Sequence, residues 1–119
     1  MAKYIGAISQ NIINLLGLNC SPETPIYIGE QNEEHMKKSH QFDYEIYRDE
    51  LPNIIANPDY VGLNKDNSIE YIKEFPVDDD FVKVAVRVST NNKYFARTLY
   101  TISRKRVLDF LAKGTIKKV

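Results

Sequence analysis

Two histidines lie five residues apart in the stretch His-Met-Lys-Lys-Ser-His, at His35 and His40. Histidine titrates near neutral pH, so it is well suited to transferring protons. In a helix, five positions turn the chain by about 140°, so these rings do not share a face as a zinc-binding i, i+4 pair does. With a single distant cysteine, Cys20, and no further clear ligand, we expect no metal and no cofactor. Both histidines are candidates for proton transfer, and His40, near the expected helix end, is also a candidate for a structural role.

Residues 81–103 supply the second group of reactive side chains. They are predicted to form two long strands joined at Asn91-Asn92, since asparagine tolerates the positive φ of a tight hairpin turn. Pairing outward from that turn places Arg87 opposite Ala96. Alternation along the strands then predicts an apolar face with Val82, Val84, Val86, Val88, Phe95 and Leu99. The opposite face is predicted to carry Lys83, Ala85, Arg87, Ser89, Tyr94, Ala96, Thr98 and Tyr100.

Arg97 does not fit this pattern, because alternation places it on the apolar face between Phe95 and Leu99. Two explanations are open. The side chain could reach past a sheet edge, or a β-bulge could turn it toward the other face.

A histidine-bearing helix and a basic, hydroxyl-rich sheet are the parts that metal-independent RNA cleavage requires. A base takes the proton of the 2′-hydroxyl, an acid protonates the departing 5′ oxygen, and a fixed cation stabilises the charge on the phosphoryl oxygens. Arginine binds phosphate through two parallel hydrogen bonds, and tyrosine can stack on a base. These residue types favour an RNA-directed site.

The neutral net charge hides a segregation. From residue 81 onward the chain carries ten lysines and arginines and a single acid, Asp109, so residues 1–80 are correspondingly acidic. The basic segment either offers a surface to a polyanion or is neutralised by the acidic segment across the folded surface.

Length and composition indicate one domain, residues 1–119, with a single hydrophobic core. The lone cysteine cannot form an intramolecular disulfide, which fits a reducing compartment. Polar residues interrupt the short apolar run near the N-terminus, so we expect no signal peptide and no membrane span. A cytoplasmic location is therefore expected.

Periodicity and turn residues predict the elements that position these side chains. Strands are expected at residues 3–8, 25–29, 60–63 and 68–75 and in the hairpin, and helices at residues 10–16, 31–40, 42–49, 53–57 and 104–113. The predicted fold is an α+β domain, with N-terminal helices followed by a four-stranded antiparallel β-meander and a C-terminal helix.

Several short motifs occur together in this chain, from Ile5 to about Lys117. They are H-M-K-K-S-H, N-P-D-Y-V-G-L-N, S-I-E-Y-I-K-E-F, V-A-V-R-V-S and Y-F-A-R-T-L-Y-T. In this order and spacing the chain resembles the phage-associated barnase–EndoU–colicin–RelE-like nucleases. The resemblance implies their fold, with helices before an antiparallel meander, and a metal-independent endoribonuclease acting as a toxin or phage-defence factor.

The resemblance also implies roles for individual residues. The helix histidine of the family matches His35, with His40 second; the strand cation matches Arg87 or Arg97, and the last-strand hydroxyls match Thr98 and Tyr100. His35 is then the general base or acid, both arginines hold the phosphate, and the product carries a 2′,3′-cyclic phosphate. Lys38, Lys83, Ser89 and Tyr94 are the predicted substrate-binding residues.

Other readings of the same residues stay open. Arg87 could pair with a carboxylate of the acidic segment, and Tyr94 and Tyr100 could be ordinary cross-strand aromatic residues. The chain could also be a non-catalytic module that binds RNA or a protein through its basic face, or an enzyme acting on a small phosphorylated ligand. The expected partners are an RNA substrate and, for a toxin, a protein antitoxin or inhibitor.

Overall fold

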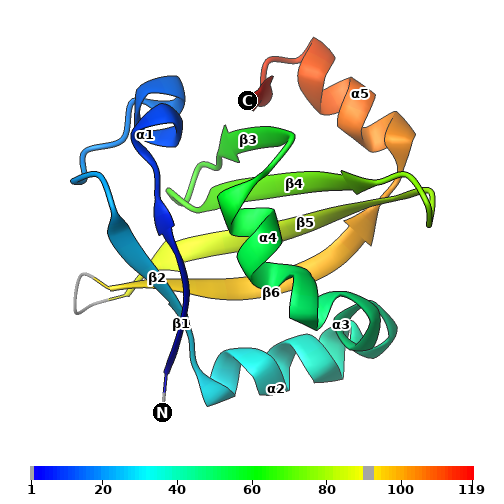
Figure 1. The fold of residues 1–119 in the computed structure, drawn as a ribbon. Coiled ribbons are helices and arrows are strands. Elements are labelled where there is room, and N and C mark those ends of the chain that lie inside the picture. The colour runs from blue at the N-terminus through cyan, green and yellow to red at the C-terminus, as the bar shows by residue number, and fades with distance from the viewer. Residues whose placement is uncertain (1, 90–92) are drawn as a thin grey trace.

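The structure is a computed structural model that describes residues 2–89 and 93–119. In this part of the chain an α+β fold is built on a seven-stranded mixed sheet with the order β1-β2-β6-β5-β4-β3-β7 (Figure 1). The predicted fold class is therefore confirmed. The predicted Asn91-Asn92 turn lies outside the described residues.

The elements follow the predicted boundaries closely. The strands are β1 (Lys3–Ile8), β2 (Thr24–Ile28), β3 (Tyr60–Leu63), β4 (Ile69–Phe75), β5 (Asp80–Val88), β6 (Tyr94–Ile102) and β7 (Ile116–Lys118). The helices are α1 (Gln10–Leu16), α2 (Glu30–Ser39), α3 (Gln41–Tyr47), η1 (Arg48–Glu50), α4 (Leu51–Ala56) and α5 (Arg104–Ala112). Serine side chains cap two of them: Ser9 accepts from the Ile12 amide before α1, and Ser103 accepts from the Arg106 amide before α5.

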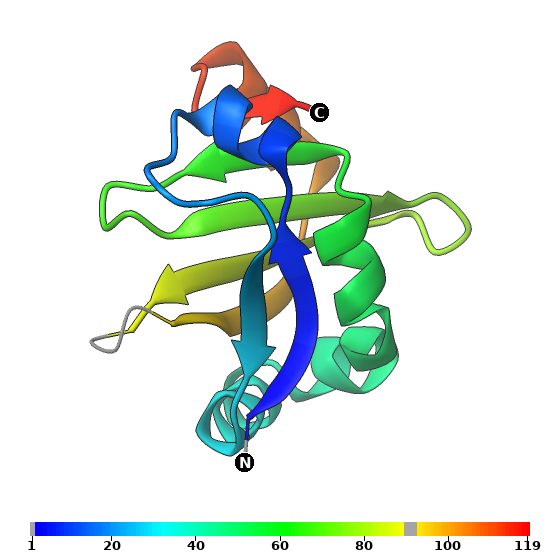
Figure 2. The ribbon, with the colours of Figure 1, turned by 60° about the vertical axis from the view of Figure 1, so that its left-hand side comes forward.

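The prediction that the sheet is a four-stranded meander was wrong. Strands β3 to β6 are antiparallel neighbours, but β1 and β2 extend the sheet beside β6, and β7 extends it beside β3. Strand β2 runs parallel to β6 through the pairs Ile26–Tyr94 and Tyr27–Phe95. Figure 2 shows β1 and β2 twisted in front of the remaining strands. Periodicity identifies a strand but not its neighbours, so a pairing between segments so far apart in the chain was not predictable from it.

A β-bulge corrects the predicted register of the β5–β6 hairpin. The pairs Ala85–Thr98 and Lys83–Tyr100 agree with the prediction, but the register shifts between Ala85 and Val86. Nearer the turn, Arg87 lies opposite Phe95 rather than Ala96. Of the two explanations for Arg97, the structure therefore supports the bulge.

The same shift exchanges the faces of the residues before the bulge. Ala96 is fully buried and Tyr94 packs against the main core, whereas both were expected on the polar face. Phe95, expected in the core, lies on the other side and lines a pocket beside Arg97.

The two faces of the sheet are covered differently. The main core combines Val82, Val84 and Val86 of β5 with apolar residues of α1, α2, α3 and α4. A smaller cluster on the other face joins Ile72, Phe81 and Ile102 to Val107 of α5 and to Ile116 of β7. Because α5 covers one end of this second face, the part beside it can hold a site.

Candidate functional site

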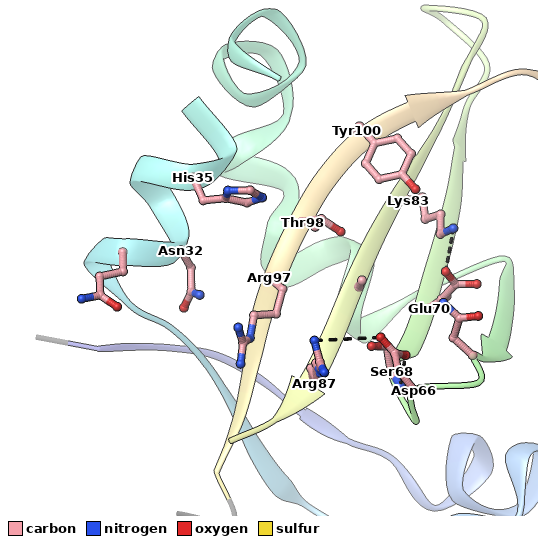
Figure 3. A pocket seen from close by; sticks show the side chains of 13 residues that line it. Asn32, His35, Asp66, Ser68, Glu70, Lys83, Arg87, Arg97, Thr98 and Tyr100 are labelled. Carbon is pink, nitrogen blue, oxygen red and sulfur yellow. Dashed lines mark hydrogen bonds and ion pairs between the residues drawn. The ribbon is translucent and has the colours of Figure 1, made fainter. Parts of the chain in front are cut away.

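A pocket of about 500 Å³ lies on the face of the sheet that carries α5. One wall is α2, the floor is formed by β4, β5 and β6, and the segment between β3 and β4 closes the far side (Figure 3). It is lined by Gln31, Asn32, His35, Asn64, Asp66, Ser68, Glu70, Lys83, Ala85, Arg87, Arg97, Thr98 and Tyr100. The pocket therefore joins side chains from segments that are distant in the sequence.

His35 enters the pocket from α2. The Asn32 side chain accepts a hydrogen bond of 2.9 Å from the Gly29 amide, which caps the start of this helix. Met36 is fully buried in the main core and holds α2 beside β6. Gln31 and His35 are one turn apart, so both line the pocket while Met36 points away from it. The imidazole is exposed and lies opposite Thr98 and Arg97 in Figure 3.

Arg87 and Arg97 supply positive charge from neighbouring strands. Nη1 of Arg87 lies 3.9 Å from Oδ2 of Asp66, and both side chains are about half exposed. Hydrogen bonds from Ser68 lower the pKa of Asp66 below its usual value, and the charge of Arg87 adds to this effect. Water screens an exposed pair of this kind and makes it weak, so a phosphate could replace the carboxylate. Arg97 forms no ion pair with any described residue.

A buried ion pair forms the floor of the pocket. Nζ of Lys83 lies 2.6 Å from Oε2 of Glu70, with the two side chains 10% and 8% exposed. Burial alone would lower the pKa of Lys83, but its hydrogen bond to Glu70 and the charge of that carboxylate outweigh burial and raise the pKa. The ammonium also lies 5.6 Å from the ring centres of Tyr100 and Phe110. Lys83 is therefore a fixed cation held by the protein itself.

His40 does not line the pocket. It lies at the junction of α2 and α3, and its ring stacks on Tyr100 with centres 4.9 Å apart and planes 25° apart. Since Tyr100 lines the pocket, His40 can orient the phenol without touching a ligand. The prediction that the two histidines occupy different faces agrees with this arrangement.

Three predicted substrate-binding residues lie elsewhere. Lys38 lines a separate depression with Glu34, Lys37, Gln41 and Glu45. Tyr94 packs against the core beside Cys20, and burial and then that neighbour raise its pKa. Ser89 is outside the pocket lining, and its amide donates to the Lys93 carbonyl.

Glu70 is the main residue of this pocket that sequence reasoning missed. It stands within the run Ile69, Glu70, Tyr71, Ile72, in which every residue is buried. A carboxylate in such an apolar strand requires a partner, and this signal could have identified it. Asp66, Ser68 and Asn64 lie in or beside the turn before β4. The sequence predicted this turn but did not indicate that it would face the pocket.

Within residues 2–89 and 93–119, no three histidine, cysteine or acidic side chains are grouped as metal ligands. The same residues contain no helix with the length and apolar character needed to span a membrane.

The site combines an exposed imidazole, three cations and the hydroxyls of Thr98 and Tyr100 around a concavity large enough for a nucleotide. Such a set can bind a phosphodiester and move a proton beside it. The pocket therefore belongs to the class of sites that bind an anion and carry out acid–base chemistry.

Comparison with known families agrees with this class. The family model for phage-Barnase-EndoU-ColicinE5/D-RelE like nuclease 3 matches residues 3–109, so the chain belongs to this nuclease family. No curated protein and no solved structure shows a significant match. The matched residues include the whole pocket lining, so the site and the family assignment concern the same part of the chain.

Proposed function

We propose that this chain is a metal-independent endoribonuclease that cleaves RNA to a 2′,3′-cyclic phosphate. The observation that carries the proposal is the meeting of His35, Arg87, Arg97, Thr98 and Tyr100 in one pocket. Three elements contribute these side chains, although α2 and β6 are more than fifty residues apart in the sequence. The nuclease family supplies the reaction class.

His35 carries one of the two proton transfers. Its imidazole is exposed on the pocket side of α2, where a ribose hydroxyl or a leaving oxygen can reach it. Arg97 binds the scissile phosphate, because it forms no ion pair with any described residue. Arg87 exchanges its weak contact with Asp66 for the phosphate, and Thr98 and Tyr100 donate hydrogen bonds to the substrate.

Lys83 acts through charge and not through direct binding. Its ammonium is held by Glu70, so it contributes a fixed field at the floor of the pocket and supports the Tyr100 ring. The substrate-binding role expected for Lys83 thus becomes a supporting one.

The test is cleavage of a mixed RNA pool in EDTA by wild type, His35→Ala and Lys38→Ala. Lys38→Ala is the matched control, since this side chain lies on the same helix but outside the pocket. Loss of a positioned acid–base group lowers the rate by roughly 10²–10⁴-fold, so we expect His35→Ala to lose turnover and keep RNA affinity. Lys38→Ala should cleave as wild type does.

Products ending in 2′,3′-cyclic phosphate, formed by wild type and Lys38→Ala only, would support the proposal. Equal cleavage by His35→Ala would remove His35 from the mechanism. Intact RNA with every variant, together with a salt-sensitive gel shift that Arg87→Ala weakens, would instead identify a non-catalytic RNA-binding module.

We further propose that the nuclease acts in the cytoplasm as a toxin or phage-defence factor, and that an antitoxin or inhibitor protein covers the basic face. The phage association of the family supports this role. Expression of wild type should arrest growth of the host cell, whereas His35→Ala should be tolerated. Equal growth with both proteins would contradict a toxin role.

A further inference from the structure

Three aromatic side chains form a row that leads into the candidate site. Tyr4 of β1 pairs with Tyr27 of β2, Tyr27 pairs with Phe95 of β6, and Phe95 lies opposite Arg87 of β5. The ring centres are 6.2 Å apart between Tyr4 and Tyr27 and 6.1 Å apart between Tyr27 and Phe95. Directly paired residues share a face of a sheet, so the row lies on the face of the pocket and ends at Arg87.

The row exists because of the β-bulge, which was one of the two explanations for Arg97, and because of a strand pairing that was not predicted. The bulge turns Phe95 out of the core, and the parallel pairing of β2 with β6 brings Tyr27 beside it. Ile26 and Ile28, the neighbours of Tyr27, are buried on the opposite face. Tyr4 is 64% exposed, and Tyr27 and Phe95 are partly exposed. The main core therefore does not require these three rings.

A second pocket connects the row to the first. Phe95 lines it together with Gly29, Glu30, Gln31, Asn32 and Arg97. Arg97, Gln31 and Asn32 line both pockets, so the two pockets adjoin each other. Arg97 and Glu30 are the charged side chains of this second lining and Phe95 is its aromatic side chain, so the pocket offers one ring beside the Arg97 cation.

We propose that Phe95, Tyr27 and Tyr4 form a stacking subsite for the unpaired bases of a single-stranded RNA that flank the cleaved nucleotide. The inference rests on the proposed function. A base stacks on Phe95, the phosphate next to it binds Arg97, and the strand continues into the first pocket. Base-on-aromatic stacking does not depend on sequence and is a general means of holding single strands.

The geometry selects an unpaired strand. Intervals of about 6 Å are wider than the 3.4 Å repeat of a duplex strand, so each ring can accept a base only from a chain that is extended and unstacked. Neither aromatic pair is stacked face to face, with planes 75° and 44° apart. Duplex RNA, whose bases are stacked on each other, cannot use this row.

The experiment measures binding of a short oligouridine to wild type and to Phe95→Leu, Tyr27→Leu and Tyr4→Leu. A 2′-deoxy substitution at the cleavage position blocks turnover, and leucine preserves apolar packing while removing the aromatic face. Phe42→Leu is the matched control, because Phe42 is an exposed aromatic residue on α3, away from the row. Thermal unfolding confirms that each variant is folded.

We expect each substitution in the row to weaken binding between about 5-fold and 150-fold, while Phe42→Leu binds as wild type does. Stacking releases no counterions, so the salt dependence should stay unchanged in these variants, whereas Arg97→Ala should reduce its slope by about one. Two further oligonucleotides carry a 5-iodouridine next to the cleavage position, one on its 5′ side and the other on its 3′ side. One of these two oligonucleotides should crosslink to Phe95 or Tyr27.

Folded row variants that bind as wild type does, beside a weakened Arg97→Ala, would overturn the subsite and leave the nuclease proposal standing. Equal binding of duplex and single-stranded RNA would also overturn it. Absence of any RNA binding by wild type would overturn both proposals.

Discussion

The Lys83–Glu70 pair allows the sharpest prediction on energetics. Nζ of Lys83 and Oε2 of Glu70 are 2.6 Å apart, and the two side chains are 10% and 8% exposed. Water therefore cannot solvate either charge fully when its partner is removed. We consider Lys83→Met and Glu70→Leu, singly and together. Each single change leaves one buried charge unpaired and should lower the free energy of unfolding by about 3–5 kcal/mol. The double variant removes both charges and should recover most of that loss, since an apolar pair of similar volume is often neutral or stabilising.

Thermal unfolding measures the effect directly. In a domain of this length 1 kcal/mol corresponds to roughly 3–6 °C in Tm, so each single variant should melt about 9–30 °C below wild type. Urea unfolding with constant slope checks that the transitions are two-state.

The pH dependence of Glu70→Leu tests the burial of Lys83 separately from its pairing. In Glu70→Leu burial lowers the pKa of Lys83 and only the weaker interaction with Tyr100 opposes it, so stability should rise with pH. In wild type the pKa of Lys83 is raised, so its contribution is complete below about 10.4, the usual lysine value, and is lost as pH rises through the raised pKa. A double variant as unstable as the singles, or singles within about 1 kcal/mol of wild type, would refute this reasoning.

Three further predictions concern single side chains. Tyr71 is fully buried and its hydroxyl finds no partner among the described residues, so Tyr71→Phe should raise the free energy of unfolding by about 1 kcal/mol in urea titrations. Burial also raises the pKa of Tyr71, so wild type should lose more stability than this variant as pH rises above 10.0. A Cβ at Gly62 would lie 2.7 Å from the Thr115 carbonyl oxygen, so Gly62→Ala should displace β7. The free energy of unfolding should fall by about 1–3 kcal/mol, and thermal unfolding measures this loss. An unchanged Tm would contradict the contact. If His40 acts by stacking on Tyr100, His40→Ala should lower kcat severalfold, whereas His40→Phe should retain the kcat of wild type. An equal loss of kcat in both variants would indicate a chemical role for His40.

Local pattern was sufficient to predict most elements of this fold. Alternating valines identified β5, and the predicted helix boundaries lie close to those observed. These signals depend on residues that are close together in the sequence, so they can be recognised without knowledge of the tertiary contacts. β7 was missed because a strand of three residues is too short to show a period.

The sequence by itself also determined the types of residue in the candidate site: histidine, arginine, threonine and tyrosine on a helix and a hairpin. Only the tertiary structure decided which of them meet. The bulge placed Arg97 with Thr98 and sent Tyr94 to the core, and the pairing of β4 with β5 brought Glu70 to Lys83. Such decisions depend on strand register and on contacts between distant segments, and both are set by the packing of the whole sheet. The aromatic row of Tyr4, Tyr27 and Phe95 has the same origin, because it exists only where β1, β2 and β6 lie side by side.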